Sequence, residues 1–225
     1  MFDTFFFAVF PYLCVGVAVV GGVYRYATDR FSYSSQSSQF LENRALFWGS
    51  VTWHYAIIVV LLAHIAALAF STEWGDLVAN PTRLYTLEAV GLALGFAALL
   101  GLIILVLRRI QSRRVGAVTS RADWLLLLVL LAQVATGVAI ALAYRWGSDW
   151  YVHTAGPWVA SLFELQPNTE LIAILPWTVK LHALGGFLLI AMFPFTRLVH
   201  IVTVPVTYLW RPYQVVIWNR QRAAR

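Results

Sequence analysis

The sequence has 225 residues, of which 60% are apolar and only 12% are charged. A typical soluble domain is about 45–50% apolar and about 25% charged, so this chain has too little charge to cover a surface in contact with water. A chain this apolar is driven to bury its side chains, so its composition excludes intrinsic disorder. The single cysteine, Cys14, excludes a disulfide framework and an iron–sulfur cluster held by this chain alone. The composition predicts an integral membrane protein, and a net charge of +6 is then more typical of cytoplasmic loops than of nucleic-acid binding.

Five stretches are long and apolar enough to cross about 30 Å of hydrocarbon as α-helices, which rise about 1.5 Å per residue. None of them shows the alternation of a membrane strand. The first opens with Asp3 rather than a basic segment, which favours a retained helix over a cleaved signal peptide. We predict an all-α bundle forming a single transmembrane domain over residues 1–225. The expected spans are about 4–24, 46–71, 84–107, 123–144 and 177–204, followed by a basic tail over 205–225.

Basic residues are concentrated on one predicted side of the membrane. Thirteen of the 16 Lys and Arg residues follow the first or third span or lie from the end of the fifth span onward; the others are Arg83, Arg145 and Lys180. Since cytoplasmic loops carry an excess of Lys and Arg, we predict the N-terminus outside and the C-terminus in the cytoplasm. The connections 73–83 and 145–175 then face outward. The longer one contains Trp150, Trp158 and Phe163, and we expect it to lie flat on the membrane surface.

Four of the five histidines lie in two of the predicted spans. His54 and His64 are in the second, and His182 and His200 are in the fifth. Polar side chains at this depth are costly and typical of functional sites. Because the two spans run in opposite directions, His54 and His200 are expected near the inner side and His64 and His182 near the outer side. The eighteen residues from His182 to His200 make about five helical turns, which predicts that both lie on one helix face.

Two histidines from facing helices can occupy both axial positions of a haem iron. Without a CxxCH motif any haem is non-covalent, so we predict two b haems, each with two histidine ligands. The same four histidines could instead line the path of a haem-free proton or metal transporter. His153 lies in an outward connection and is expected to be a surface residue.

Other residues could complete haem sites. Small side chains near the histidines would let a macrocycle approach the helices: Gly49, Ala56, Ala63, Ala66, Ala183, Gly185 and Gly186. Basic side chains near the membrane edges could pair with propionates: Arg44, Arg108, Arg109 and Arg197 inside, and Arg83 and Lys180 outside.

The segments that carry the histidines resemble a known family. They are WHYAIIVVLLAH (53–64) and KLHALGGFLLIAMFPFTRLVHIVTVP (180–205), and they resemble the gamma subunit of respiratory nitrate reductase. YRYATDRFSYSSQSSQFLE (24–42) and LRRIQSRRV (107–115) are similar too, so the resemblance covers nearly the whole chain. It implies a five-helix cytochrome b in which His54 and His200 ligate an inner haem and His64 and His182 an outer one. It also implies that Arg109 binds a haem propionate.

The resemblance also implies a function in the plasma membrane of a prokaryote. The family's subunit oxidises quinol near the outer face, and electrons pass to a cytoplasmic iron–sulfur beta subunit and a molybdenum-containing alpha subunit that reduces nitrate to nitrite. Arg83 stands where the family has a lysine near the quinol site, and His64 and Glu88 are further candidates there. Glu88 could accept a quinol proton, or it could extend to the outer surface or pair with Lys180.

Other functions stay open at this point. A similar cytochrome could serve nitrite oxidation or the reduction of sulfur compounds or heterodisulfides. The chain could also be a passive membrane anchor. We expect lipid and quinol as partners and no nucleic acid.

Overall fold

The computed structural model describes residues 2–32, 38 and 40–202, and all regular structure among them is helical. Five helical segments are long and apolar enough to cross a membrane: Phe2–Thr28, Arg44–Ala69, Pro81–Gln111, Arg121–Ala143 and Trp177–Phe195. This confirms the predicted all-α class and the number of spans, and it indicates a multi-pass membrane protein. Residues 203–204 of the fifth predicted span and the basic tail 205–225 lie outside the described residues.

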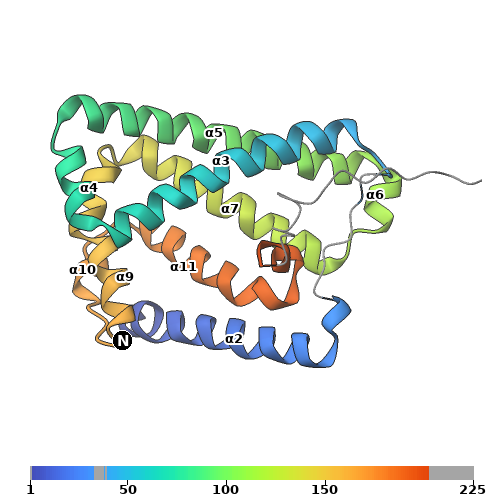
Figure 1. The fold of residues 1–225 in the computed structure, drawn as a ribbon, viewed down its shortest axis with the longest axis horizontal. Coiled ribbons are helices and arrows are strands. Elements are labelled where there is room, and N and C mark those ends of the chain that lie inside the picture. Colours follow the sequence, from blue (N-terminus) through green and yellow to red (C-terminus); the bar gives the residue numbers. More distant parts are fainter. Residues whose placement is uncertain (1, 33–37, 39, 203–225) are drawn as a thin grey trace, which may run out of the picture.

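The long helices pack side by side, and short helices close both ends of the bundle (Figure 1). The first span joins α1 (Phe2–Thr4), the π-helical turn η1 (Phe5–Val9) and α2 (Phe10–Thr28). The other long helices are α3 (Arg44–Ala69), α5 (Pro81–Gln111), α7 (Arg121–Ala143) and α11 (Trp177–Met192). The shorter elements are η2 (Arg30–Ser32), α4 (Ser71–Val78), α6 (Arg113–Ala117), α8 (Gly147–Trp150), η3 (Tyr151–His153), α9 (Ala155–Phe163), α10 (Glu170–Ala173), η4 (Phe193–Phe195) and η5 (Arg197–Ile201).

Local sequence fixes where two of the spans begin. The Asn80 side chain accepts the backbone N–H groups of Thr82 and Arg83 and thereby caps α5, whose first residue is Pro81. At α7, Ser120 and Asp123 accept each other's backbone N–H groups in a capping box.

Helices α3, α5 and α7 share a hydrophobic core, whose buried members are Ala56, Ala98, Leu102, Leu127, Val134 and Val138. The backbones of α3 and α5 come so close that a Cβ atom on Gly101 would lie 2.7 Å from the Trp53 nitrogen and 2.8 Å from the Gly49 oxygen. The expectation that Gly49 and Ala56 face a macrocycle is therefore wrong, because both pack against α5.

The fifth span departs most from its prediction. The α-helix ends at Met192 instead of running on to 204, and the chain continues as the 3₁₀ turns η4 and η5. Pro194 explains the end, because proline lacks an N–H and its ring clashes with the preceding helical turn. Thr196 between the two turns is extended, at φ −126° and ψ −175°. His182 and His200 are therefore not on one face of a single helix.

The connection 145–175 folds against one end of the bundle rather than along a membrane surface throughout its length. Trp158 on α9 is buried against Phe7, and its indole Nε1 donates to the Phe7 carbonyl at 2.9 Å. The prediction of a surface position is therefore wrong for Trp158, whereas Phe163 is 79% exposed.

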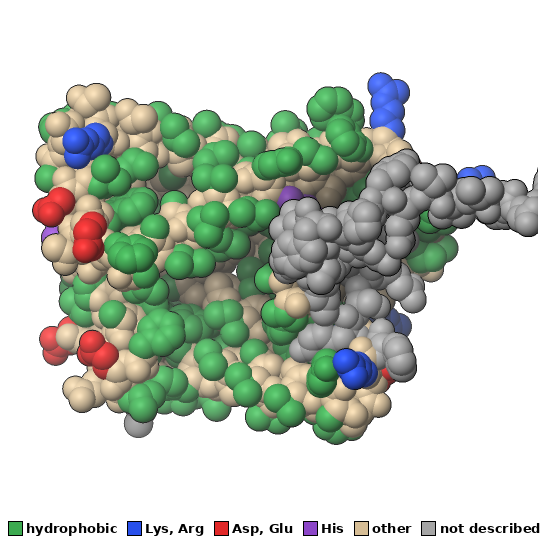
Figure 2. Space-filling model, in the orientation of Figure 1, with side chains coloured by type: hydrophobic (Ala, Val, Ile, Leu, Met, Phe, Trp, Pro, Cys, Tyr) green, Lys and Arg blue, Asp and Glu red, His purple; other side chains and the backbone are tan. Residues whose placement is uncertain are grey.

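The arrangement separates two ends of the molecule. The N-terminus lies at the end that carries α4, α9 and α10, while α6 and the end of α2 lie at the other (Figure 1). Large apolar side chains stay exposed along the helices between the ends, among them Val20, Ile58 and Leu128 (Figure 2). These surfaces are suited to lipid. Which end faces the cytoplasm stays a prediction.

Candidate functional site

His54 on α3 and His200 on η5 lie against each other at the end of the bundle near α6. Their ring centroids are 6.0 Å apart and the ring planes meet at 77°. Metal–imidazole bonds of about 2 Å on either side of one iron place two axial imidazole centres about 6 Å apart. The spacing of this pair therefore fits two axial ligands of one haem. Although the helix breaks at Pro194, η5 still carries His200 toward α3.

The ring nitrogens of three histidines are held in the same way. In each, Nδ1 lies within hydrogen-bond distance of a backbone carbonyl about one turn earlier in the chain. The carbonyls are those of Ser50 for His54 (2.7 Å), Val60 for His64 (2.8 Å) and Arg197 for His200 (2.6 Å). A carbonyl at Nδ1 favours the tautomer with its proton there and leaves the Nε2 lone pair for a metal. This donor chemistry fits haem ligation.

His182 is held by a different helix. Its Nδ1 lies 3.0 Å from the Gln133 carbonyl and 3.2 Å from the Thr136 hydroxyl, both on α7. The Gln133 side-chain amide also donates to the His182 carbonyl at 3.0 Å. The sequence analysis missed Gln133 and Thr136, although polar side chains inside an apolar span were a signal that could have found them.

His64 and His182 form the second predicted pair, on α3 and α11 respectively. His64 is exposed, and the ring of Tyr151 from η3 stands edge-on to it, with centroids 6.1 Å apart. Burial raises the pKa of the Tyr151 hydroxyl above its usual value. Tyr151 is a further residue that the sequence analysis missed.

Within the described part of the chain, no group of three or more His, Cys, Asp or Glu side chains could hold a free metal ion.

The two basic residues at the end of α5 differ in their partners. Arg108 is fully buried and binds Glu42 at 2.6 Å and Ser38 at 3.0 Å. A hydrogen bond from the Ala45 amide, with Arg108 as a further cause, holds the pKa of Glu42 below its usual value. In contrast, the Nε atom of Arg109 is buried and has no hydrogen-bond partner among the described residues. Arg109 is thus the better candidate of the two for an acidic group.

The other basic candidates are either paired or exposed. Arg197 binds Asp123, and Lys180 lies 3.6 Å from Asp3. The suggested pair between Glu88 and Lys180 is therefore wrong, and Glu88 instead accepts the Ser148 N–H at 2.8 Å. Arg44 and Arg83 are exposed.

Arg83 lines a shallow groove of about 260 Å³ together with Leu77, Thr82, Thr86 and Leu87. Among the described residues, no hydrogen bond or ion pair joins Arg83 to Glu88 or His64. The three quinol candidates thus do not form one bonded cluster.

Comparison with known proteins gives a consistent result. The sequence model described as "Nitrate reductase gamma subunit" matches residues 3–219. The chain is 32% identical to the nitrate reductase gamma chain of Bacillus subtilis over 92% of its own length and 94% of the relative's. It is 30% identical to the respiratory nitrate reductase 1 gamma chain of Escherichia coli over 95% and 96%. It also matches 33% of the length of a longer nitrate reductase-like protein of Mycobacterium tuberculosis at 34% identity. This chain therefore belongs to the nitrate reductase gamma subunit family.

Proposed function

We propose that this chain is the membrane cytochrome b subunit of a respiratory nitrate reductase and holds two non-covalent b haems. The observation that carries the proposal is the 6.0 Å spacing of the His54 and His200 rings, which fits one iron between them. These two residues would hold the inner haem, and His64 and His182 the outer one. Arg109, whose buried Nε has no hydrogen-bond partner in the part of the chain that the structure describes, would bind a propionate.

The protein would oxidise quinol near the outer face and deliver the electrons to the cytoplasmic side. When bound, haem supplies one-electron redox chemistry at two depths of the membrane. The carbonyls at Nδ1 would keep each imidazole oriented and its Nε2 available. His64, Arg83 and Glu88 are the candidates for the quinol site.

The redox partners would be a cytoplasmic iron–sulfur beta subunit and a molybdenum-containing alpha subunit that reduces nitrate to nitrite. The names of the two gamma-chain relatives support an assembly of this kind. The chain would lie in the plasma membrane of a prokaryote with its N-terminus outside. It would not reduce nitrate by itself.

The first experiment is a dithionite-reduced optical spectrum and a pyridine haemochrome assay on the complex purified from native membranes. We expect two b haems per chain that become oxidised when nitrate is added. Haems that stay reduced when nitrate is added would indicate another catalytic partner, such as a nitrite-oxidising or sulfur-compound enzyme. A folded complex without haem would refute the proposed function. The four histidines would then be interpreted as lining the path of a proton or metal ion.

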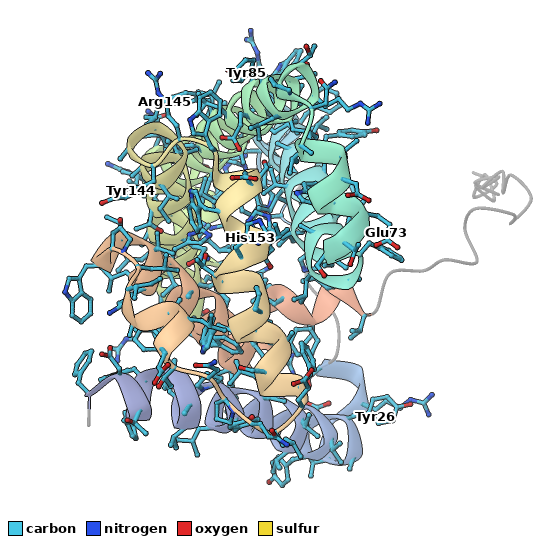
Figure 3. The ribbon with its side chains drawn as sticks, turned by 90° about the vertical axis from the view of Figure 1, so that its left-hand side faces the viewer. Tyr26, Glu73, Tyr85, Tyr144, Arg145 and His153 are labelled. Carbon is cyan, nitrogen blue, oxygen red and sulfur yellow. The ribbon has the colours of Figure 1, made fainter. Side chains whose placement is uncertain are left out.

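Single-histidine variants sharpen this test. His64→Ala and His182→Ala should each remove the outer haem and abolish quinol oxidation, because the iron loses an axial ligand. His153→Ala is a suitable control, since His153 is exposed on the outer connection (Figure 3). Two haems retained in both ligand variants would contradict the assignment.

A further inference from the structure

We propose that Asp123 is a positioning residue for His200, acting through Arg197. The role in haem binding rests on the proposed function, whereas the role in fixing the turn that carries His200 does not. Asp123 lies on α7 and His200 on η5, so the proposal links two elements that are far apart in the sequence.

The connection consists of short, direct hydrogen bonds. Arg197 Nε lies 2.6 Å from Asp123 Oδ1, and Arg197 Nη2 lies 3.1 Å from Oδ2. This two-bond geometry fixes the direction of the guanidinium as well as its distance. The backbone carbonyl of the same Arg197 lies 2.6 Å from His200 Nδ1. Asp123 thus fixes the residue whose carbonyl orients the imidazole.

The break in the fifth span explains why His200 needs such an anchor. Because α11 ends at Met192 and Thr196 is extended, no continuous helix transmits the position of His182 to His200. A 3₁₀ turn of five residues has little stability of its own. Its place must therefore come from contacts with other helices.

Helices α2 and α7 supply contacts of this kind. On α2, Arg25 Nη1 donates to the Pro194 carbonyl at 2.6 Å and so holds the chain just before η5. On α7, Asp123 holds η5 itself through Arg197. Asp123 is a firm support, because it is only 5% exposed and is also fixed by the capping box with Ser120.

The test compares two disrupting variants with two matched controls in the purified complex. Asp123→Asn removes the charge that binds Arg197, and Arg197→Lys keeps the positive charge but loses the two-bond geometry. Glu42→Gln makes the same carboxylate-to-amide change in the other Arg–carboxylate pair at this end, between Arg108 and Glu42. Ser120→Ala removes only the bond from the Asp123 amide to the Ser120 hydroxyl, and it keeps both the Ser120 N–H bond to Asp123 Oδ2 and the bonds to Arg197.

The main readouts are haem content and the low-spin EPR signal, which depends on the orientation of the axial imidazoles. We expect both disrupting variants to shift the signal of one haem and to weaken its retention about 10-fold or more, while both controls keep two haems and the original signals. Because Arg197→Lys preserves charge, a shift in that variant reports position rather than electrostatics. Unchanged EPR signals and haem content in both disrupting variants would overturn the positioning role.

Hydrogen exchange of the amides over residues 196–202 gives a readout that needs no haem. We expect faster exchange there in Asp123→Asn and Arg197→Lys than in the wild type, and no change in Glu42→Gln. If the wild type held no haem but this difference appeared, the proposed function would fail while the structural link stood. Equal exchange in all variants would refute the link itself.

Discussion

Gln133 makes His182 different from the other three paired histidines. The Nδ1 atoms of His54, His64 and His200 each face a carbonyl in their own segment of chain, whereas His182 Nδ1 faces one on α7. The orientation of the proposed outer ligand therefore depends on how α11 packs against α7. A small change at that interface should alter one haem site and spare the other.

Gly185→Ala provides such a change. A Cβ atom at this position would overlap Gln133 Oε1, so the Gln133 side chain must move and give up its bond to the His182 carbonyl. Alanine is at the same time the better helix former by about 1 kcal/mol, so the fold should survive. We expect a shifted EPR signal and weaker retention for the outer haem, measured on the purified complex.

Gly186→Ala is the matched control for this prediction. Its Cβ would lie 3.7 Å from Gln133 Nε2, which is an ordinary van der Waals distance. The two variants share the same helix and the same gain in helix propensity. Identical outer-haem spectra in both would show that Gln133 does not hold His182 in place.

The sequence was sufficient to identify residues whose side-chain type alone indicates a function, such as histidines inside a membrane span. Four histidines in two apolar spans predicted the inner pair, which the structure brings to 6.0 Å. The sequence did not reveal Tyr151 or Asp123. Their significance depends on contacts across 87 residues for Tyr151 with His64 and across 74 for Asp123 with Arg197. Such partners follow from packing and not from local spacing.

At the scale of elements, the contact between α3 and α5 depends on glycine. A Cβ atom on Gly101 would lie 2.7 Å from the Trp53 nitrogen, and backbone atoms cannot swing aside as a flexible side chain can. Gly101→Ala should therefore push the helices apart and cost about 1–3 kcal/mol by overpacking. We expect a lower thermal midpoint of the complex and weaker inner-haem retention, because His54 follows Trp53 directly.

Gly91→Ala on the same helix separates packing from helix propensity. No atom lies within 4 Å of a Cβ at Gly91, so this variant should be as stable as the wild type or slightly more stable. Equal thermal midpoints for the two variants would mean that α3 and α5 can separate without cost.

The end of the fifth helix shows where prediction of elements reaches its limit. Pro194 indicated a kink, but the apolar residues around it favoured one continuous span to 204. The structure ends the helix at Met192, and the Pro194 carbonyl, which then has no helical partner, accepts a hydrogen bond from Arg25 instead. Whether a proline bends a helix or ends it depends on such partners, which lie far away in the sequence.

At the scale of the whole molecule, charge is divided between the two ends. Acidic side chains gather at the end that carries α4, α9 and α10 (Figure 2), among them Glu73, Asp76, Asp149, Glu164 and Glu170. At the other end, Glu42 and Asp123 are paired with Arg108 and Arg197, which leaves a predominantly basic surface. This division agrees with the positive-inside pattern that the sequence predicted.

The orientation of the bundle can be measured by cysteine labelling in intact cells. Because Cys14 is the only cysteine and is buried, Cys14→Ala gives a background with no thiol. In this background we compare Glu73→Cys on the acidic end (Figure 3) with Arg113→Cys on α6, both at exposed positions. A membrane-impermeant maleimide should label the first and spare the second, because the excess of arginine keeps the α6 end in the cytoplasm. Opened cells provide the control, since both positions should then react. Labelling of the α6 position alone in intact cells would reverse the orientation and place the His54–His200 pair on the outer side.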